Sequence, residues 1–243
     1  MELNKIYNED CLEGMKRIPD KSVDMILADL PYGTTSCKWD TIIPFEPLWE
    51  QYNRVIKDNG AIVLTASQPF TSALVMSNVE GFKHEWIWNK VLPSGFQVAK
   101  YKPLLKHESV LIFTNKGKKT NYKPIMVKRD KPKKSKMYGK SESNPISYND
   151  GKVRTYTHRY PQSIIEFSNA NQKAKQHPTQ KPVALFEYLI KTYTNEGETV
   201  LDNVMGSGTT AIAAMNTGRN FIGFEMEEGY YKISLDRIEQ AKK

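Results

Sequence analysis

The sequence predicts an α/β fold in which a mostly parallel, doubly wound sheet carries helices on both faces. Short apolar runs, each typical of a buried strand, alternate along the chain with segments of helical periodicity. Two of these runs, Val23–Ala28 and Thr199–Asp202, lead into turns that contain proline or glycine. Because the strands of such a sheet end at one edge, we expect functional groups in the loops that follow these runs.

The individual elements are predicted from local patterns, in chain order. Strands are predicted at the apolar runs 23–28, 61–65, 85–88, 109–113, 199–202 and 220–224. Helices are predicted where apolar residues recur at helical spacing, at 45–57, 69–77, 179–193 and 209–216. Thr179 is expected to cap the third of these helices, with Pro182 in its first turn. The span 116–149, rich in Lys, Ser, Pro and Asn, is expected to hold mobile loops.

Composition places the chain among globular proteins. Of its 243 residues, 39% are hydrophobic and 26% are charged, which excludes a disordered chain. It contains no run of about 18 apolar residues that would span a membrane, and its start lacks the apolar core of a signal peptide. We therefore expect a soluble, cytoplasmic protein. Cys11 and Cys37 form no C-x-x-C pair and stand near no histidine cluster, so neither a metal site nor a disulfide framework is expected.

The charge of the chain is unevenly distributed. The formal net charge is +8, but residues 115–176 contain 16 basic and four acidic side chains, so this segment carries +12 and the remainder −4. Tyrosines and His158 stand among these charges. Basic side chains neutralise phosphates and aromatic rings stack on bases, so the mixture favours nucleic-acid contact over a merely solvated surface. The predicted organisation is a basic insert at 115–176 between two halves of one domain, 1–114 and 177–243.

A glycine-rich turn after the strand at 199–202 is a candidate nucleoside-binding loop. Gly206–Gly208 leads from that strand into a helix, and glycine lets a backbone turn tightly and approach a ligand. Glu225 ends the next strand, where a carboxylate can accept hydrogen bonds from ribose hydroxyls. No Gly-Lys-Thr completes a phosphate loop, which disfavours ATP. NAD fits the local pattern, but about 35 residues follow the turn, too few for the rest of a nicotinamide-binding sheet unless the fold is permuted.

The segment Asp29-Leu30-Pro31-Tyr32 follows the first buried strand and offers what a nucleobase amino group needs. The Asp29 carboxylate and the carbonyl of Leu30 can accept its two N–H hydrogen bonds, which moves the nitrogen lone pair out of ring conjugation and toward an electrophile. Pro31 is rigid, and the ring of Tyr32 can stack on the base. The alternative interpretation is an ordinary strand-end turn with a surface acid.

These motifs together resemble the amino-methyltransferases that act on DNA with S-adenosyl-L-methionine. Asp29-Leu30-Pro31-Tyr32 matches their Asp/Asn/Ser-Pro-Pro-Tyr/Phe/Trp signature except at Leu30, and Asp202 to Thr210 is similar to their cofactor motif, with departures at Asn203 and Val204. The catalytic motif precedes the insert and the cofactor loop, an order that resembles the permuted β class. The resemblance implies a Rossmann-like methyltransferase sheet with a basic target-recognition insert.

The resemblance also implies which residues bind the cofactor. His177-Pro178-Thr179-Gln180-Lys181-Pro182 matches a segment that helps to bind the methionine part. Asn8-Glu9-Asp10-Cys11 is similar to a stretch whose acid meets the adenine amino group, although Asp10 is also suited to cap a helix before Leu12. The cofactor-binding residues so implied are Asp10, Cys11, Asp29, His177, Thr179, Lys181, Asp202, Gly206, Ser207, Gly208, Thr209, Thr210 and Glu225.

The activity implied is methylation of a base flipped out of double-stranded DNA. In the resembled family an Asp at the position of Asp29 usually accompanies adenine, so N6-methyladenine is the expected product. N4-cytosine methylation, an RNA base, a protein glutamine and a non-catalytic nucleic-acid-binding relative are the alternatives. Glutamine enzymes usually have Asn at the first signature position, and the intact motifs disfavour a non-catalytic protein.

The expected DNA contacts divide between the pocket and the insert. Tyr32 is expected to stack on the base, with Trp88 or Phe96 as candidates for its opposite face, although Trp88 fits the core better. The insert residues expected to bind DNA are Lys131, Lys133, Lys134, Lys136, Arg154 and Arg159. Asn169 and Asn171 are further candidates for reading base edges. A homodimer and a cognate restriction endonuclease, as in restriction–modification, are partners that the resemblance allows.

Overall fold

The protein, seen in a computed structural model, is described at residues 1–35, 37, 40–136, 152–169 and 180–242. It divides into two compact units, one formed by Met1–Lys123 with Ser163–Lys243 and the other by Pro124–Gln162. Within the described residues, the first unit contains an eight-stranded sheet and the second a two-stranded sheet. In this part of the chain no helix is long and apolar enough to cross a membrane.

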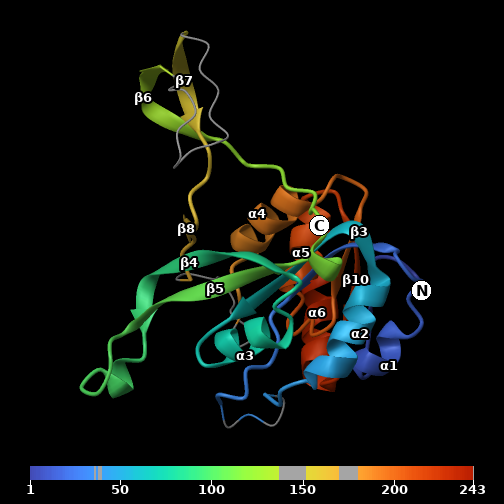
Figure 1. Ribbon diagram of the computed structural model, residues 1–243. Helices are drawn as coiled ribbons and strands as arrows, with labels where there is room; N and C mark the ends of the chain where they lie inside the picture. Colours follow the sequence, from blue (N-terminus) through green and yellow to red (C-terminus); the bar gives the residue numbers. More distant parts are fainter. Residues whose placement is uncertain (36, 38–39, 137–151, 170–179, 243) are drawn as a thin grey trace. The chain divides into compact units, whose positions relative to one another are not determined.

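The first unit alternates strands and helices along the chain (Figure 1). Its strands are β1 (Lys5–Tyr7), β2 (Val23–Ala28), β3 (Ile56–Ala66), β4 (Phe82–Ser94), β5 (Leu105–Phe113), β8 (Ile164–Glu166), β9 (Thr199–Asp202) and β10 (Asn220–Phe224). Its helices are α1 (Cys11–Met15), α2 (Phe45–Val55), α3 (Phe70–Ser77), α4 (Val183–Tyr193), α5 (Thr209–Asn216) and α6 (Glu228–Ala241), with short 3-10 turns η1 (Phe96–Val98) and η2 (Asn115–Gly117).

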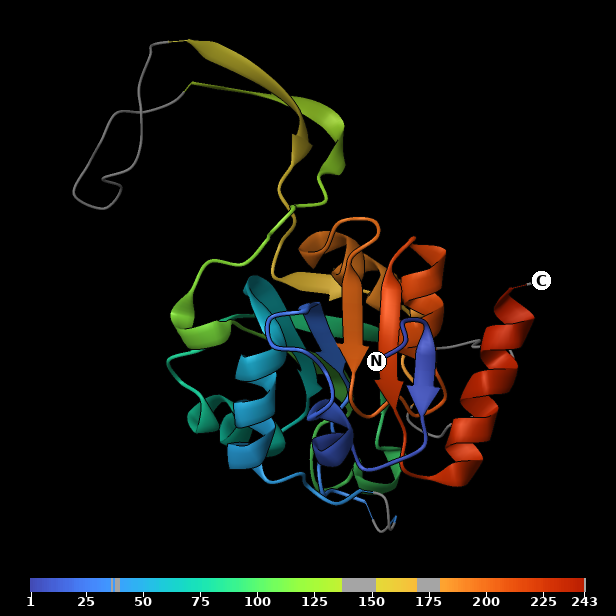
Figure 2. The ribbon, with the colours of Figure 1, turned by 90° about the vertical axis from the view of Figure 1, so that its right-hand side faces the viewer.

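The strand order is β1-β10-β9-β2-β3-β5-β4-β8. The five strands from β1 to β3 are mutually parallel, β5 is antiparallel to both of its neighbours, and β8 is parallel to β4. Figure 2 shows β1, β9 and β10 pointing the same way, so their carboxyl ends share one edge. The predicted mostly parallel α/β sheet is confirmed.

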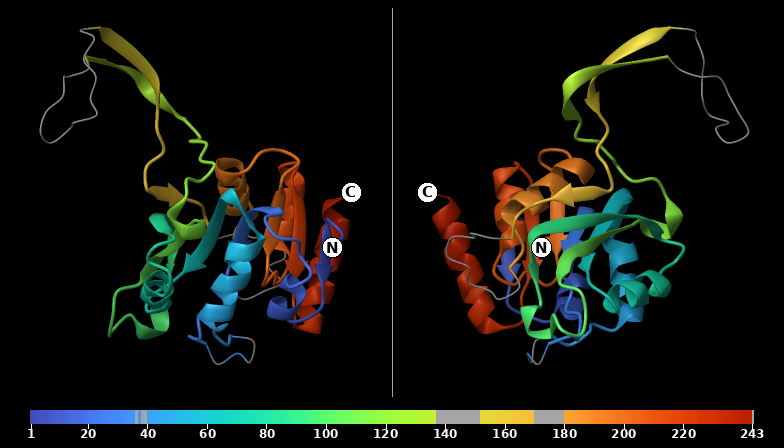
Figure 3. Two further views of the ribbon diagram at one scale, coloured as in Figure 1. Left: turned by 45° about the vertical axis from the view of Figure 1, so that its right-hand side comes forward. Right: turned by 90° about the vertical axis from the view of Figure 1, so that its left-hand side faces the viewer.

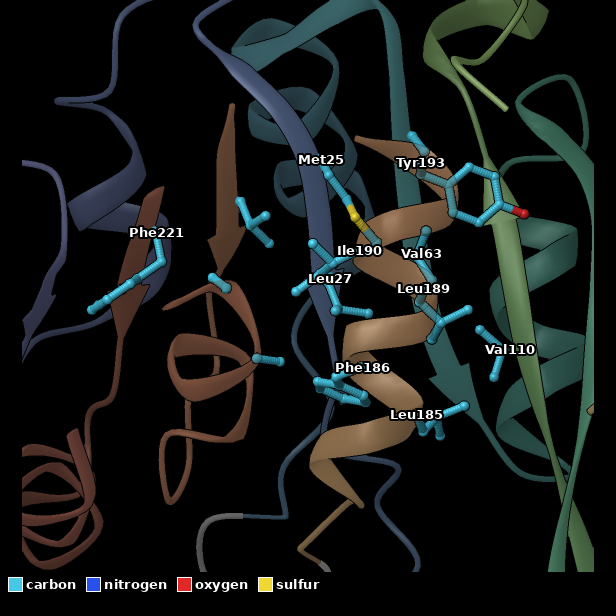
Figure 4. Packing of buried hydrophobic residues seen from close by; sticks show 14 of the residues in the cluster. Met25, Leu27, Val63, Val110, Leu185, Phe186, Leu189, Ile190, Tyr193 and Phe221 are labelled. Atoms are coloured by element: carbon cyan, nitrogen blue, oxygen red, sulfur yellow. The ribbon is translucent and has the colours of Figure 1, made fainter. Parts of the chain in front are cut away.

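Two hydrophobic cores, one on each face of the sheet, make it doubly wound. Side chains alternate along β2, so Met25 and Leu27 join one core while Ile26 and Ala28 join the other. The first core includes residues of α4, α5 and α6, and the second includes residues of α1, α2 and α3. Figure 4 shows the first core, where side chains of α4 lie over β2, β3 and β5. This central placement keeps β2 and the loop after it on a rigid base.

Most predicted elements occur, and one helix start is corrected. α5 and β10 have the predicted bounds, whereas the helix expected from residue 179 begins at Val183, with Pro182 at its N-cap and no side-chain cap bond. Proline fits this position because the first helical N–H groups have no partner within the helix. Thr179 lies outside the described residues, so the structure does not describe it as a cap. The prediction missed β1, β8 and α6.

The second unit contains an antiparallel hairpin of β6 (Val127–Lys136) and β7 (Val153–Arg159). The expectation of mobile loops is wrong for 127–136, because backbone pairing holds this lysine-rich segment extended while Lys131, Lys133 and Lys134 are exposed. The register shifts between Lys128 and Lys133, around Pro132, which has no N–H for a ladder bond. Residues 115–123 and 163–169, within the basic segment of the sequence, belong to the first unit.

Candidate active site

Two acids lie at the carboxyl ends of neighbouring parallel strands. β2 pairs with β9 through Met25–Val200 and Ile26–Leu201. Asp29 directly follows β2, and Asp202 is the last residue of β9. The catalytic and glycine-rich loops are therefore brought together by the sheet, as the permuted order of motifs predicts.

The Asp29 carboxylate is held by three donors among the described residues. Its Oδ1 accepts hydrogen bonds from the hydroxyls of Tyr32, at 2.8 Å, and of Thr65 on β3. Its Oδ2 accepts one from the Lys181 ammonium at 2.7 Å. A carboxylate has about four lone-pair positions, so these donors leave one acceptor position on Oδ2. Leu30 is buried in the core beneath the loop, which anchors the loop where the signature has a proline.

A buried chain of alternating charges extends from Asp29. Lys181 also lies 3.4 Å from Oε2 of Glu108 on β5, and Oε1 of Glu108 is 3.1 Å from the ammonium of Lys90 on β4. Burial by itself lowers the pKa of Lys181, but the Asp29 and Glu108 carboxylates outweigh it and raise that pKa above its usual value. Lys181 therefore stays charged, and its charge is neutralised inside the protein.

Tyr32 contributes its hydroxyl as well as its ring. Burial, with the nearby charges of Asp29 and Glu108, raises the pKa of Tyr32 well above its usual range, so the hydroxyl remains a donor to Asp29. The ring stacks on Phe70 with centroids 5.2 Å apart and an interplanar angle of 25°, and the Lys181 ammonium lies 5.7 Å from its centre. One face of Tyr32 is thus already covered.

Asp202 shapes the glycine-rich turn from inside. Its carboxylate accepts hydrogen bonds from the Val204 N–H, at 3.0 Å, and from the Thr210 hydroxyl at the start of α5. Burial raises the pKa of Asp202 to about 7. Gly208 has a φ of +85°, and a Cβ there would lie 3.1 Å from the Cβ of Ser234 on α6, so only glycine allows α5 and α6 to approach this closely.

Glu225 ties the end of β10 to the same turn. Its Oε2 accepts a hydrogen bond from the Gly206 N–H at 2.7 Å, and its Oε1 accepts one from the Glu227 N–H at 2.8 Å. Burial raises the pKa of Glu225 despite these bonds. Ser207 is fixed beside it by Arg237 and by Gln180. Glu225 is therefore positioned by backbone groups while lining the site.

Asp10 caps α1 by accepting hydrogen bonds from the N–H groups of Leu12 and Glu13. The alternative role weighed for Asp10 is thus realised, and the residue also lines the site. Cys11 is buried and accepts a hydrogen bond from Asn203 at 3.4 Å, and burial raises the pKa of its thiol to about 11. The Cys11 thiol is protonated at neutral pH and is no nucleophile.

These loops surround one cavity of about 600 Å³ at the carboxyl edge of the sheet. The predicted site residues that line it are Asp10, Cys11, Asp29, Leu30, Pro31, Tyr32, Lys181, Asp202, Gly206, Ser207, Thr209, Thr210 and Glu225. The sequence analysis gave no role to several other lining residues, among them Lys90, Ser94 and Glu108. A charged residue inside or beside an apolar strand, as at Lys90 and Glu108, is the signal that could have found them.

The remaining predicted residues are divided between the cavity wall, the second unit and the part of the chain outside the described residues. His177 and Thr179 are outside the described residues. Lys131, Lys133 and Lys134 are exposed on β6 in the second unit, with Arg154 and Arg159 on β7, whereas only the backbone of Lys136 is described.

Trp88 is buried and donates a hydrogen bond to the Phe167 carbonyl, in agreement with a core role, although it also lines the cavity. Asn169 lines the cavity, and Asn171 lies outside the described residues.

Comparison with known proteins assigns the family. Residues 23–236 match the sequence model of the N6/N4 methyltransferase family, described as DNA methylase. The DNA adenine methyltransferase YhdJ of Escherichia coli is 30% identical over 258 residues, with 99% of this chain and 84% of the relative covered. The type II methyltransferase M.HpaI of Haemophilus parainfluenzae is 27% identical and covers 97% and 74%. The chain belongs to the DNA methylase family, as its motifs predict.

Solved structures agree with this assignment. The complex of M1.HpyAVI with S-adenosylmethionine superposes with a TM-score of 0.62 at 27% identity, covering 96% of this chain and 98% of the other. The cytosine-N4-specific PvuII DNA methyltransferase has a TM-score of 0.69 at 16% identity, covering 98% and 89%, which shows a shared fold.

Proposed function

We propose that this enzyme transfers a methyl group from S-adenosylmethionine to the exocyclic amino group of a DNA base, adenine N6. The observation that carries the proposal is the place of Asp29: its carboxylate, with one acceptor position left by the described donors, shares a cavity with Glu225 and the Gly206–Gly208 turn. An acceptor for an amino group and a nucleoside-binding loop are therefore within one enclosure.

The residues lining the cavity fit S-adenosylmethionine. A Cβ at Gly206 would meet no atom closer than 4.0 Å, so the turn leaves open space on this side. Asp10, Asp29, Asp202 and Glu225 all line the cavity, and this excess of carboxylates suits a cationic ligand. Glu225 would hold the ribose hydroxyls and Asp10 the adenine amino group. When bound, the cofactor supplies an electrophilic methyl group on a sulfonium ion.

Asp29 would receive the target base. Its open acceptor position and the Leu30 carbonyl would accept the two amino N–H bonds, which directs the nitrogen lone pair toward the methyl group. The Lys181 ammonium holds the Asp29 carboxylate in place through Oδ2, and the carboxylate would stabilise the positive charge that develops on the nitrogen. The ring of Tyr32, which lines the cavity, would stack on the extruded base and offset part of an unstacking cost of about a few kcal/mol.

Adenine is favoured over cytosine by Asp29 at the first signature position and by the relative named as a DNA adenine methyltransferase. N4-cytosine methylation is the second candidate, because the PvuII enzyme shares the fold. Nucleoside mass spectrometry of DNA from cells with and without the gene tests the choice. N6-methyladenine is expected. N4-methylcytosine as the main product would contradict the base assignment, and the absence of both would contradict the function.

The hairpin unit would bind the DNA backbone. β6 presents Lys131, Lys133 and Lys134 to solvent, and Arg154 and Arg159 stand on β7. Their charges suit phosphate contacts, which position a duplex without reading its sequence. Base edges would be read by further side chains of the 115–176 segment.

Cellular partners complete the proposal. Relatives named as type II methyltransferases support double-stranded DNA as the substrate. The methylation would take place in the cytoplasm. A cognate restriction endonuclease would make host survival depend on this methylation, which deletion of the methyltransferase gene tests. A homodimer would be detected by light scattering of the purified protein, where a monomer mass over the working concentration range would exclude it.

A further inference from the structure

β4 and β5 continue as an arm beyond the sheet, defined here as residues 91–106 (Figures 1 and 3). Ser109 of β5 pairs with Ala66, the last residue of β3, so residues 105–108 lie past the carboxyl end of β3. At about 3.3 Å per residue, these four residues extend about 13 Å past that edge. The arm therefore projects on the side of the sheet that carries Asp29.

The base of the arm borders the cavity. Ser94 of the arm lines the cavity together with Lys90 and Glu108, which lie just outside the arm on β4 and β5, and Ser94 is itself exposed. Val91 has a φ of +67°, a costly conformation for a β-branched residue. Such strain is found where function requires a particular chain direction, and here it occurs where β4 leaves the cavity wall.

The surface of the arm is both apolar and basic. Phe96 is 66% exposed and Tyr101 87% exposed, so neither ring is used in the core. Leu92, Val98 and Leu105 are exposed as well. The arm carries the exposed lysines Lys100, Lys102 and Lys106 and contains no acid. Exposed rings among uncompensated lysines are the composition of a surface that meets nucleic acid.

We propose that the arm enters the DNA at the target site, where its aromatic tip, Phe96 with Tyr101, occupies the space that the flipped base leaves. This inference rests on the proposed function. Base extrusion leaves a gap in the stack, and an inserted apolar side chain restores contacts with the bases on either side. The lysines of the arm contact the flanking phosphates, which holds the tip against the duplex.

Charge complementarity favours DNA as the occupant. A second copy that packed arm against arm would place the same three lysines against one another, whereas a duplex offers phosphates to all of them. The position is also suitable, because Ser94 of the arm lines the cavity that would receive the base and is exposed to solvent.

The test compares the Phe96→Ala/Tyr101→Ala variant with the wild type. Sequencing of plasmid DNA modified in cells first identifies the methylated sequence. A short duplex of that sequence then carries 2-aminopurine at the target position, and its fluorescence reports unstacking. A second duplex has adenine at the target and an abasic nucleotide opposite it, which removes the pairing that resists extrusion.

The variant should not show the fluorescence increase. Its kcat/KM on the fully paired duplex should be at least about tenfold lower than that of the wild type, the equivalent of about 1.4 kcal/mol. The defect should largely disappear on the abasic duplex, because the base is then already free to leave the stack. Calorimetry with S-adenosylmethionine should show unchanged cofactor binding and so a folded protein. Met76→Ala/Val79→Ala, which removes exposed apolar side chains outside the arm and the cavity, should behave as the wild type.

Wild-type kinetics on both duplexes would overturn the inference, as would an equal loss on both, which indicates contact without insertion. Failure of the proposed function is distinguishable, since the wild type itself would then methylate no DNA.

Discussion

The ammonium of Lys181 lies 2.7 Å from Oδ2 of Asp29, although 152 residues separate them in the chain. Lys181 precedes α4 in the cofactor half, and Asp29 directly follows β2 in the catalytic half. Glu108 approaches the same ammonium from β5. Three segments that are distant in the sequence therefore determine the charge around the acceptor for the target base. Substitutions in any of them should alter the rate of methyl transfer.

Asp29→Ala should abolish methyl transfer and leave cofactor binding intact, because the carboxylate is assigned to the base. A methyl-transfer assay combined with calorimetry using S-adenosylmethionine measures the two effects separately. Asp58→Ala, an exposed acid near the amino end of β3, is the matched control and should keep full activity. Retained turnover in Asp29→Ala would remove Asp29 from the mechanism.

Lys181→Met should lower the free energy of unfolding by about 3–5 kcal/mol, because it removes the cation that pairs with the Asp29 and Glu108 carboxylates in a largely buried site. Replacing both partners by neutral side chains removes the Asp29 carboxylate as well, so Asp29→Asn/Lys181→Met should be more stable than Lys181→Met alone. Urea unfolding of the wild type and of both variants measures these differences. Lys232→Met, which breaks an exposed pair with Glu228, should leave stability unchanged. If the single and double variants unfold alike, the buried pair does not set this stability.

Glu225→Ala should weaken S-adenosylmethionine binding by about 1.5–3 kcal/mol, the range for hydrogen bonds to a charged group. The exposed Glu228→Ala serves as control, since Glu228 pairs with Lys232 outside the cavity. Calorimetry gives both affinities. Equal affinities would show that Glu225 only supports the turn through Gly206.

Asp202 should make stability fall as the pH rises toward neutrality. Burial raises its pKa to about 7 in the folded protein, against about 3.9 in an unfolded chain. The raised pKa means that its contribution to stability is fully present below pH about 4 and is lost as the pH rises through 7. Asp202→Asn should therefore show a flatter dependence of melting temperature on pH between 4 and 7. Superimposable pH profiles for the two proteins would contradict the raised pKa.

Replacement of Lys131, Lys133, Lys134 and Lys136 by Gln should weaken DNA binding and flatten the plot of log K against log salt. Each lost phosphate contact changes the slope by about 0.9. Fluorescence anisotropy over a salt series measures it. The control replaces four lysines of the first unit that sit in exposed ion pairs, Lys5, Lys16, Lys232 and Lys242. An unaltered slope in the hairpin variant would show that these lysines of β6 are solvated and make no phosphate contacts.

Much of the fold could be predicted because the central strands are buried on both faces and read as apolar runs. α5 and β10 match their predicted bounds because each is preceded by a turn that contains a glycine with positive φ, Gly208 and Gly218 respectively. β1 and β8 are three residues long and depend on pairing with β10 and β4, which no local pattern reveals. β6 was missed because ladder pairing outweighs the low strand propensity of lysine.

The parts of the site that consist of consecutive residues could be predicted from the sequence. The parts that are formed by residues from separate strands could not. The loops after β2 and β9 were recognised from their local residues. The resemblance assigned Lys181 to the cofactor, whereas the structure places its ammonium on Asp29 and Glu108. Thr65, Lys90 and Glu108 reach the site only because β3, β4 and β5 lie side by side, and that neighbourhood is a long-range property of the sheet.

β1 pairs with β10 through Lys5–Ile222, so the first and last strands of the chain are neighbours at one edge of the sheet. A circularly permuted chain, joined between α6 and β1 and opened in the hairpin of β6 and β7, would keep every strand neighbour of the larger sheet. It would also carry the glycine-rich turn ahead of Asp29 along the chain. The order of the two motifs is thus set by where the polypeptide is opened, whereas the surroundings of Asp29 are set by strand adjacency.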